Sequence, residues 1–573
     1  MSDAIQKRHL PSFLQAFTLF EGLRGVSKAD LPKEAMAGVT LAALMVPLNI
    51  GYAQVAGLPP IVGLYSAIFP MIIFALLSSS RQLVAGPDAP VAALIGSLLG
   101  AMAAPDDPHY LQLALAQALM CAVVFFIFWI FRLGFLANFL SRAVMTGFVT
   151  GLGIEVLSSQ IQKIMGVSVD AEGWFREQWQ VIKAIPDISW WSMFVGISTI
   201  VTIRLCKKFL PKLPGALVAL VIFTAFVSIF NLDKHGVSVL GDVPSGLPTP
   251  TYPHGVSLGE YLNLLVGALA LCGVTLADAL LVGKSYAQKN GYPMDADQQL
   301  FAFGAANVAS GFTGGFMVGS SASRTAAIDG TGSRSQWPSI IGAGVVALVV
   351  LFLTGLLALL PNAVLGGIVA NAVLALIEIG EIRELFKVRR DEALVAVSCA
   401  LGVLVLGSLK AVIFSFLLST IMIVRKSSEA TSAVLGQVDG HRNFVSIKRH
   451  DGASTKPGLV VYRFSSPLYF ANADTFLTEV TELIETSDPP LEWFVLDAEA
   501  ITDIDTTGAD VIGQALNLAE KHHVVFNVSR LEEEVRKLLE RYELLDRIGD
   551  EHIYVTNQRA EAAFEKRGEA APV

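Results

Sequence analysis

The sequence predicts two domains, a polytopic all-α membrane domain of about fourteen segments and a small α/β domain after it. Three observations lead to this prediction. Hydrophobic residues make up 53% of the 573 positions and charged residues only 16%, whereas soluble domains carry about 25% charged residues. Nearly all long apolar runs lie between Glu34 and Val424. After that point the composition is that of a soluble domain, in which short strands alternate with helices.

These composition changes divide the chain into successive ranges. We expect a polar cytoplasmic segment at 1–33, a membrane domain at 34–426, a linker at 427–442, the α/β domain at 443–560 and a tail at 561–573. The first range lacks the apolar stretch of a signal peptide, so we expect the first membrane helix to direct insertion.

Each membrane segment is predicted from an apolar run that approaches the roughly 20 residues needed to span a bilayer. The runs lie at 34–56, 61–78, 109–131, 138–160, 190–206, 213–231, 259–283, 297–311, 337–359, 362–380, 393–408 and 409–424. Two further runs, 88–104 and 320–333, are too short or too polar to span alone. We therefore predict half-helices there.

Basic residues gather at alternate ends of these runs. Lys33 precedes the first run, and Arg204 and Lys207 follow a later one, whereas the opposite ends carry acidic residues such as Asp106 and Asp233. Because Lys and Arg are enriched in cytoplasmic loops, we expect both termini in the cytoplasm. We expect the protein to lie in the lipid bilayer of the inner or plasma membrane of the cell.

Two apolar regions are interrupted in the same way. At 82–94 and again at 314–327, an extended run is followed by a Gly or Pro break and then by the start of a helix. Paired breaks in corresponding halves of a membrane chain are the best sequence indication of a transporter's substrate site. The second break carries Arg324, a fixed positive charge at membrane depth. We therefore predict that the substrate is an anion.

The C-terminal domain is predicted to be a small, largely parallel sheet covered by helices. We expect strands at 458–464, 491–497 and 523–529, and helices at 473–486, 507–521 and 530–542. The turn at 504–508 precedes the second of these helices. Asp505 or Thr506 either caps that helix or belongs to a switch, such as phosphorylation of Thr506, at a helix N-terminus where anions are favoured.

Several function classes are excluded. The net charge is -9 and no basic stripe is present, so nucleic acid is not expected as a partner. The four cysteines lie far apart in apolar runs, which predicts neither a metal site nor a disulfide framework. The sequence shows no Ser/His/Asp, metal or nucleotide-binding arrangement. We therefore do not expect an enzyme.

Several motifs, taken in their order along the chain, resemble one family. They are VPLNIGYA at 46–53, PIVGLYSA at 60–67, SSR at 79–81, the region from Asp278 to DQQ at 297–299, SRT at 323–325 and GTGSR at 330–334. The chain resembles the SulP family of anion transporters, which is related to the eukaryotic solute-carrier anion exchangers and channels. The C-terminal domain resembles that family's STAS domain, with DTTG at 505–508 on its signature turn.

The resemblance implies two intertwined, inverted repeats of seven segments, divided into a mobile core and a gate. It places the substrate between the facing N-termini of segments three and ten, the two half-helices, and it implies a homodimer. The STAS domain is expected to be regulatory or structural and to offer a site for a regulatory protein. Physical chemistry supports the substrate's location independently, because each helix start offers unpaired N–H groups and about half a positive charge.

A set of residues in the first span and around the two breaks is predicted to bind the substrate. It consists of Asn49, Tyr52, Asp88, Ala89, Ser321, Ser323, Arg324 and Thr325. Arg324 either attracts the anion or is a structural arginine that snorkels or pairs with a carboxylate such as Asp278. The hydroxyls of Ser321 and Ser323 either donate to the anion or cap the half-helix.

Two alternatives remain open in the first half. Asp88 either caps its half-helix or contributes a polar contact to the site. Leu48 stands where many relatives carry glutamine, so Asn49 or Tyr52 is expected to supply the missing contact. Tyr52 is equally interpreted as an ordinary interior aromatic residue.

Asp278 is the candidate for cation coupling. It lies in an apolar run with no basic neighbour before Lys284. Its carboxylate therefore either takes a proton, binds Na⁺ or pairs with Arg324. Family members with an acid at this position often couple transport to H⁺ or Na⁺, and the resemblance extends this to Asp278. Beyond such a co-transported ion, no cofactor or bound metal is expected.

The leading hypothesis is a secondary active transporter for sulfate, bicarbonate or a C4-dicarboxylate. We expect coupling to H⁺ or Na⁺ and an elevator or rocking movement of the core against the gate. A passive anion channel or an anion exchanger on the same fold is the alternative. A membrane-anchored STAS sensor is a third hypothesis, against which the paired half-helices argue.

Overall fold

The computed structural model describes residues 19–24, 26, 30–134, 141–167, 169, 173–210, 214–428, 430–438 and 443–569. Much of the range 1–33, together with residues 429 and 439–442 of the range 427–442 and residues 570–573 of the tail, lies outside the described residues. The chain divides into two compact units, Met1–Ser419 and Thr420–Val573. Each unit is described by itself.

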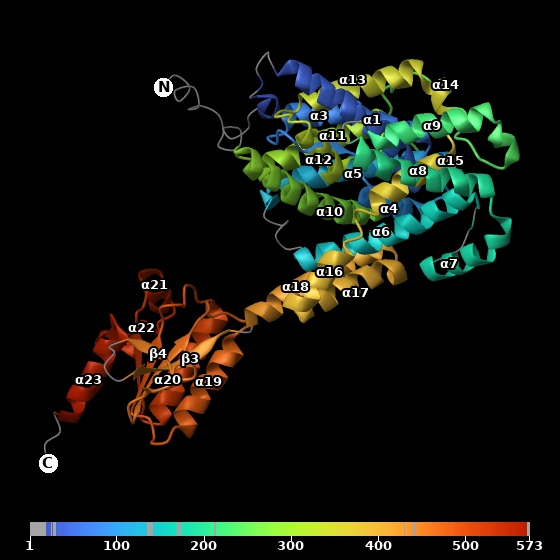
Figure 1. The fold of residues 1–573 in the computed structure, drawn as a ribbon. Coiled ribbons are helices and arrows are strands. Elements are labelled where there is room, and N and C mark those ends of the chain that lie inside the picture. Colours follow the sequence, from blue (N-terminus) through green and yellow to red (C-terminus); the bar gives the residue numbers. More distant parts are fainter. Residues whose placement is uncertain are drawn as a thin grey trace, which may run out of the picture. The chain divides into compact units, whose positions relative to one another are not determined.

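The first unit is built of helices (Figure 1). Those of its first half are α1 (Leu31–Val55), α2 (Pro60–Tyr65), α3 (Phe69–Leu77), α4 (Ala89–Gly100), α5 (Pro108–Ile130), α6 (Arg142–Met165), α7 (Trp174–Lys183), α8 (Trp190–Phe209) and α9 (Gly215–Ile229). Those of its second half are α10 (Leu258–Asn290), α11 (Ala296–Phe312), α12 (Ala322–Gly330), α13 (Trp337–Phe352), α14 (Thr354–Leu357), α15 (Asn362–Val373), α16 (Ile379–Val388), α17 (Arg390–Leu406) and α18 (Ser408–Ser428).

Within the described residues, which exclude 138–140 of the run 138–160, every predicted membrane segment coincides with helical structure, but three of the segments are broken. The run 61–78 contains both α2 and α3, and Pro70 at the start of α3 supplies no N–H to continue the first helix. The run 337–359 divides into α13 and α14, and the run 362–380 ends at Val373 before α16 begins. By length and composition alone, the described residues include five candidate spans, of which the longest is Leu258–Asn290.

The helix contacts repeat between the two halves of this unit. The packing of α1 on α13 corresponds to that of α10 on α5, and the packing of α6 on α17 corresponds to that of α15 on α8. Equivalent segments also pack on each other, as α3 does on α11 and α6 on α15. This pattern is what two inverted seven-segment repeats produce. The predicted fold class is confirmed.

Two groups of helices follow from these contacts. The core contains α1–α5 and α10–α13, and the gate contains α6, α8, α9, α15 and α17. Where α1 of the core meets α15 of the gate, Gly51 is required, because a Cβ at this position would lie 2.3 Å from Cγ2 of Val369. The two groups therefore touch in direct van der Waals contact at this point.

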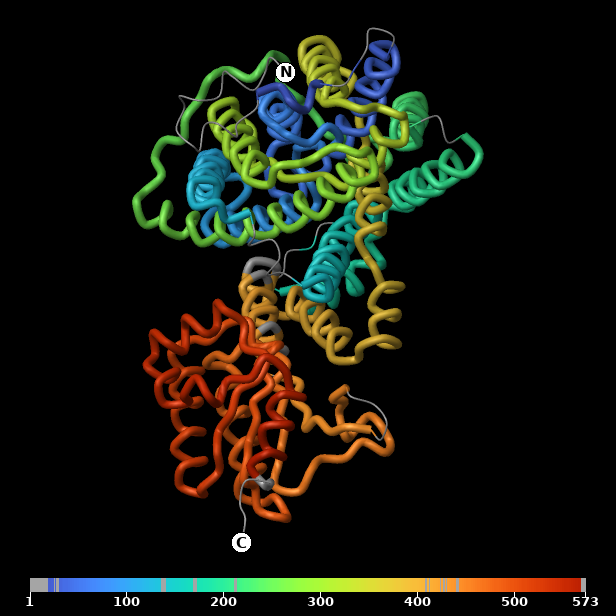
Figure 2. The backbone as a smooth tube through the Cα atoms, turned by 90° about the vertical axis from the view of Figure 1, so that its left-hand side faces the viewer, coloured from blue at the N-terminus to red at the C-terminus, as the bar shows by residue number. Residues whose placement is uncertain are grey.

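An extended segment, 238–257, crosses one end of the helices (Figure 2, green). Its backbone N–H groups bond to carbonyls at helix ends: Leu240 to Leu360, Gly246 to Val350 and Thr251 to Phe312. These ends, just before α15 and at the C-termini of α13 and α11, therefore lie on one face of the unit. We call it the 238–257 face. In the predicted orientation it is the outer face.

The second unit contains one sheet with helices on its faces. Its strands are β3 (Ser432–Val438), β4 (Phe444–Ser446), β5 (Ala453–Ser454), β6 (Leu459–Phe464), β7 (Trp493–Asp497), β8 (Val525–Ser529) and β9 (Ile553–Tyr554). Their order is β4-β3-β6-β7-β8-β9, with β5 on β3, and the strands from β6 to β9 are parallel. Its helices are α19 (Ala473–Thr486), α20 (Thr506–Lys521), α21 (Glu533–Arg541), α22 (Leu545–Ile548) and α23 (Asn557–Glu569).

Three of these strands, β6, β7 and β8, were predicted from the sequence, and the others were not. The range 427–442, predicted as a linker, contains β3, which pairs antiparallel with β6. The range 561–573, predicted as a tail, contains most of α23, whose Phe564 packs against Trp493. Neither β3 nor α23 stands out in the sequence as an apolar periodic run. Each is ordered by pairing with the sheet or packing on it, which sequence periodicity does not reveal.

Candidate functional site

A two-stranded ribbon joins the two predicted breaks. β1 (Val84–Gly86) pairs antiparallel with β2 (Gly319–Ser321), so that Gly86 lies opposite Gly319. α4 begins just after β1, and α12 begins directly after β2. Because the strands run in opposite directions, the two helices leave the ribbon in opposite directions and their N-termini face each other. Both ends present unpaired N–H groups and a partial positive charge to the space between them.

Arg324 is buried beside this ribbon, with only 1% of its surface exposed. Its Nε donates to Oγ of Ser321 at 2.9 Å, its Nη1 donates to Oδ1 of Asn49 at 3.0 Å, and its Nη2 donates to the carbonyl of Pro87. The guanidinium lies so close to Gly86 that a Cβ there would come within 2.8 Å of Nη1. The charge is therefore held between the starts of the two half-helices by neutral acceptors.

Asp278 is not the partner of Arg324. Its Oδ2 accepts a hydrogen bond from the hydroxyl of Ser320 on β2, whereas all three hydrogen bonds that Arg324 makes in the described residues go to oxygens of other residues. Of the alternatives considered for Arg324, a pair with Asp278 does not occur in this structure. The carboxylate and the guanidinium are held separately.

A cavity of about 100 Å³ lies between the core and the gate at this point. From the core it is lined by Tyr52, Asp88, Pro90, Val91, Val274, Thr275, Asp278, Ser320, Ala322 and Ser323. From the gate it is lined by Met145 and Val149 of α6, Ala372 of α15, and Ala375 and Leu376 just beyond it. The cavity thus brings together Tyr52, Asp88, Ser323 and Asp278 from the predicted set.

The other predicted residues lie behind the cavity wall. Asn49 accepts from Arg324, and Ala89 is buried as the first residue of α4. The hydroxyl of Thr325 donates to the carbonyl of Ser321 at 2.7 Å and accepts from the N–H of Val84 at 3.0 Å. Thr325 thus ties the second half-helix to the first strand.

The hydroxyls and the carboxylate at the two helix starts are not used as caps. Asp88 and Ser321 occupy the N-cap positions of α4 and α12, but neither side chain makes a capping hydrogen bond. Oγ of Ser321 accepts from Arg324 and lies 3.5 Å from Oγ of Ser323. Ser323 is exposed and lines the cavity. The carboxylate of Asp88 and the hydroxyl of Ser323 therefore face the space that a ligand would occupy.

Two polar lining residues, Thr275 and Ser320, were not singled out from the sequence. Thr275 precedes Asp278 by three positions on α10, which places both on one side of the helix. Its buried Oγ1 has no hydrogen-bond partner within the described chain. Ser320 donates to Asp278. The spacing of Thr275 from Asp278 was a usable signal, whereas the role of Ser320 depends on how β2 pairs.

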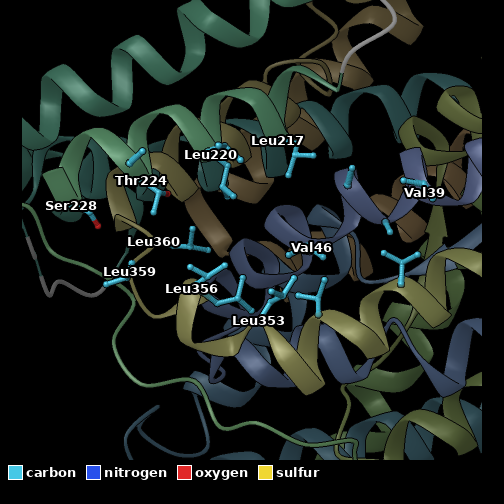
Figure 3. A pocket seen from close by; sticks show the side chains of 17 residues that line it. Val39, Val46, Leu217, Leu220, Thr224, Ser228, Leu353, Leu356, Leu359 and Leu360 are labelled. Carbon is cyan, nitrogen blue, oxygen red and sulfur yellow. The ribbon is translucent and has the colours of Figure 1, made fainter.

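No cluster of three or more His, Cys, Asp or Glu side chains with metal-ligand geometry occurs in the described part of the chain. A larger cavity, of about 570 Å³, lies between α1, α9, α13 and α14 (Figure 3). Its lining is made of Val, Leu and Ala side chains with only Thr224 and Ser228 as polar members. Without a charge or a cluster of donors, this cavity does not suit an anion.

In the second unit, the signature turn is built around a capping aspartate. Oδ1 of Asp505 accepts from the N–H of Gly508 at 2.7 Å, and Oδ2 accepts from the N–H of Phe470 at 2.9 Å. Asp505 therefore caps α20. Thr506 is the first residue of that helix and is exposed.

A buried carboxylate, Asp497, lies at the C-terminal end of β7. It accepts from Nη2 of Arg530 at 2.6 Å, from Nδ2 of Asn557 at 3.0 Å and from Nε of Arg463 at 2.9 Å. Burial alone would raise the pKa of Asp497, but the hydrogen bonds from Arg530 and Asn557 and the charge of Arg463 hold that pKa below its usual range. The network joins β6, β7, β8 and α23.

Comparison with known proteins identifies both units. Residues 31–399 match the sulfate permease family, and residues 452–560 match the STAS domain. The chain belongs to the sulfate permease family. Members of this family are transporters and not enzymes, so the chain is a multi-pass membrane protein that transports anions.

Similar proteins span almost the full length of this family member. A probable sulfate transporter of Mycobacterium tuberculosis is 36% identical over 534 residues, which cover 93% of this chain and 95% of the relative. Sulfate transporter 3.2 of Arabidopsis thaliana is 28% identical and covers 96% of this chain and 88% of its own.

Two solved structures share the fold of the sulfate permease family member. Murine solute carrier 26 family member A9, an anion transporter in the inward-facing state, superimposes with a TM-score of 0.88 at 22% identity, over 95% of this chain and 93% of its own. The transmembrane domain of the cyanobacterial bicarbonate transporter BicA gives a TM-score of 0.60 at 22% identity, over 69% of this chain and 98% of its own.

Proposed function

We propose that this chain is a secondary active transporter that carries a small anion together with H⁺ or Na⁺. The observation that supports this most strongly is the charge of the cavity. Two carboxylates, Asp88 and Asp278, line it, whereas the guanidinium of Arg324 is held behind its wall. An anion entering alone would meet both carboxylates at short range in a medium of low dielectric, where like charges repel strongly.

A cation at Asp278 would remove this repulsion. Protonation neutralises the carboxylate directly. Alternatively, the carboxylate of Asp278, the hydroxyl of Ser320 and the unpartnered Oγ1 of Thr275 offer the oxygen ligands that a hard cation such as Na⁺ prefers. Either ion would make anion binding depend on cation binding, which is the requirement for coupled transport.

The anion itself would bind between the two helix starts. The N–H groups of α4 and α12, the hydroxyl of Ser323 and the hydroxyl of Tyr52 are the donors that surround the cavity. Arg324 would add a long-range attraction without direct contact. Sulfate is the first substrate to test because several similar proteins are described as sulfate transporters, and bicarbonate and C4-dicarboxylates such as fumarate come next.

Transport would follow from movement of the core relative to the gate. The cavity is lined by both groups, so their separation on one face and closure on the other would expose the site to each side in turn. The contact between Gly51 and Val369 is apolar and can be broken without leaving a buried polar group unpaired. An elevator or rocking motion is compatible with this interface.

The decisive experiment is uptake of labelled sulfate, bicarbonate and fumarate into proteoliposomes, at two pH values and with or without a Na⁺ gradient. The proposal expects saturable uptake of one anion that collapses when both cation gradients are removed. Ohmic currents that ignore both gradients would instead identify an anion channel. Uptake that requires a counter-anion inside the vesicle would identify an exchanger.

The remaining parts of the proposal concern assembly and regulation. We place both termini in the cytoplasm and the chain in the inner or plasma membrane as a homodimer, with the STAS domain as a regulatory or structural module that binds a regulatory protein. Protease accessibility of the STAS domain in sealed vesicles tests the orientation, and mass photometry in detergent tests the dimer.

Phosphorylation of Thr506 is proposed as one form of regulation. The residue is exposed at the start of α20, where a phosphate would meet a favourable helix dipole but also the carboxylate of Asp505. Intact-mass analysis of protein purified from several growth conditions tests it. If no condition yields phosphorylated protein, this regulation is rejected.

A further inference from the structure

A further cavity of about 640 Å³, which we call the second cavity, opens at the C-termini of α1 and α6 and the N-terminus of α15, near the 238–257 face. Its polar lining consists of Gln54, Ser159, Gln162, Lys163, Ser238 and Asn362. Lys163 is the one charged side chain among the described residues that line it. Nothing in the proposed mechanism so far uses this cavity or its lysine.

The ammonium group of Lys163 has an unusual partner. Its Nζ donates to Oε1 of Gln54 at 3.0 Å, a neutral amide oxygen, and no ion pair with a carboxylate occurs within the described chain. An ammonium group has three donors and no acceptor. Gln162, which also lines the cavity, donates to the carboxylate of Glu177. Among the described residues, no carboxylate therefore contacts Lys163 to balance its charge.

Gln54 links this lysine to the other gate helix. Its Nε2 donates to Oδ1 of Asn362 at 3.1 Å, and Nδ2 of Asn362 donates to Oγ of Ser238 at 3.3 Å. Gln54 belongs to the core, whereas Lys163 and Asn362 belong to the gate. One amide side chain thus holds the core to two gate helices at this face of the molecule.

The second cavity and the substrate cavity lie toward opposite ends of the same two gate helices. On α6, Val149 lines the substrate cavity and Lys163 lines the second one, about 21 Å further along at 1.5 Å per residue. On α15, Asn362 and Ala372 are separated by about 15 Å in the same way.

We propose that Lys163 and the amide groups beside it form a second anion site, at which a small oxyanion such as sulfate waits before the core and gate separate. The anion would replace Oε1 of Gln54 as the partner of Nζ. The proposal rests on the proposed function, because it places the site on the path of the transported anion.

The test uses a cysteine reporter in the second cavity. The four native cysteines are buried, so a Ser238→Cys chain should be labelled by N-ethylmaleimide at one dominant position. Sulfate and, separately, bicarbonate are added to the full-length protein in proteoliposomes, with gluconate at equal ionic strength as the reference. We expect the anion to slow labelling at least about threefold, to lose this effect in Lys163→Gln and to keep it in Lys163→Arg, which retains the charge.

Uptake by the same lysine variants, without the reporter, provides the second readout. Lys163→Gln should raise the apparent KM about tenfold, because the anion would lose one charge-assisted hydrogen bond. The maximal rate should stay within about twofold of that of the unmodified chain. Lys163→Arg should stay close to the unmodified KM. A fall in maximal rate with unchanged KM would show that Lys163 only closes the interface.

Two further outcomes overturn the second site. One is protection by the anion that persists in Lys163→Gln, which would assign it to the cavity at Asp278. The other is labelling that neither anion slows in any variant. Failure of the proposed function would look different. Uptake by the unmodified chain would then be absent or uncoupled, but the anion would still slow the labelling of Ser238→Cys in a way that depends on Lys163.

Discussion

Nη1 of Arg324 donates a 3.0 Å hydrogen bond to Oδ1 of Asn49, and this contact holds the guanidinium behind the substrate cavity. The two residues lie on different helices of the core, α12 and α1. With Ser321 and Pro87 as its other acceptors, Arg324 serves as a fixed positive charge for both half-helix starts. Under the proposed function, this charge would attract an anion without binding it directly.

Removing this charge is expected to abolish transport. Arg324→Ala should lower anion uptake at least about 100-fold, because it removes the cation and leaves three buried acceptors unpaired. Arg324→Lys keeps a positive charge but lacks the planar guanidinium that reaches three acceptors. We therefore expect its anion uptake to fall about tenfold. Uptake into proteoliposomes measures both, and size-exclusion profiles control for folding. Full uptake by Arg324→Ala would revive the sensor hypothesis.

The coupling ion should depend on Asp278. In Asp278→Asn the amide side chain can neither take up a proton nor offer a negative charge to Na⁺. Uptake by this variant should therefore change less than about twofold when the pH gradient or the Na⁺ gradient is removed. Asp278→Glu retains the carboxylate and serves as the matched control, with coupling preserved. Initial rates with and without each gradient provide the measurement. A variant Asp278→Asn with intact coupling would direct attention to Asp88.

The closure between core and gate should depend on Gly51. In Gly51→Ala the added Cβ would lie 2.3 Å from Cγ2 of Val369, well inside the roughly 3.5–4.0 Å of a favourable carbon contact. Overpacking of this kind costs about 1–3 kcal/mol, so the separated arrangement should gain population. The Ser238→Cys reporter should then be labelled faster by N-ethylmaleimide.

The control for this prediction removes the methyl group that clashes. The double variant Gly51→Ala with Val369→Ala should return the labelling rate toward that of the reporter alone, because Cγ2 is absent. Val369→Ala by itself establishes the effect of the smaller side chain. Equal labelling in all these variants would contradict a role of this contact in closure.

The stability of the STAS domain should depend on pH through Asp497. Its pKa in the folded domain lies below the ordinary value, which is about 3.9. The ionised carboxylate of Asp497 therefore stabilises the folded domain at pH values above the ordinary pKa. This stabilisation is lost as the pH falls through the pKa of the folded state. In Asp497→Asn this pH dependence should shrink.

At pH 7 we expect Asp497→Asn to lower the free energy of unfolding by about 2 kcal/mol, less than for a fully buried pair because both arginines are partly exposed. Limited proteolysis of the full-length protein in increasing urea, at pH 7 and at a pH well below the ordinary value of about 3.9, measures it. A variant with the same midpoint as the unmodified chain at pH 7 would show that Asn557 and the two arginines do not need the carboxylate.

Much of the site's chemistry was readable from the sequence because it is local. The breaks at 82–94 and 314–327, the charge of Arg324 and the acid Asp278 each stand out against apolar surroundings. The cap at Asp505 was also predicted as one alternative, and Oδ1 of Asp505 does accept from the N–H of Gly508. Thr275 was missed although its spacing from Asp278 was visible, because one hydroxyl in an apolar helix is common.

Other features could not have been predicted from the chain alone. Arg324 and Asn49 are separated by 275 positions, and nothing in either motif indicates that they meet. The pairing of β1 with β2 decides which of Ser320 and Ser321 bonds Asp278 and which bonds Arg324. The strand β3 and the helix α23 lie in polar ranges that only packing on the sheet converts into ordered structure.

The sequence by itself determined that this is a membrane protein with two matched helix breaks, a buried positive charge and an acid nearby. Apolar periodicity and residue chemistry suffice for that, because burial and backbone preference act locally. The tertiary structure alone decided that Arg324 stands behind the cavity, that two carboxylates face it, and that Gln54 joins Lys163 to Asn362. Those relationships depend on which helices pack together, and packing is set by the whole chain at once.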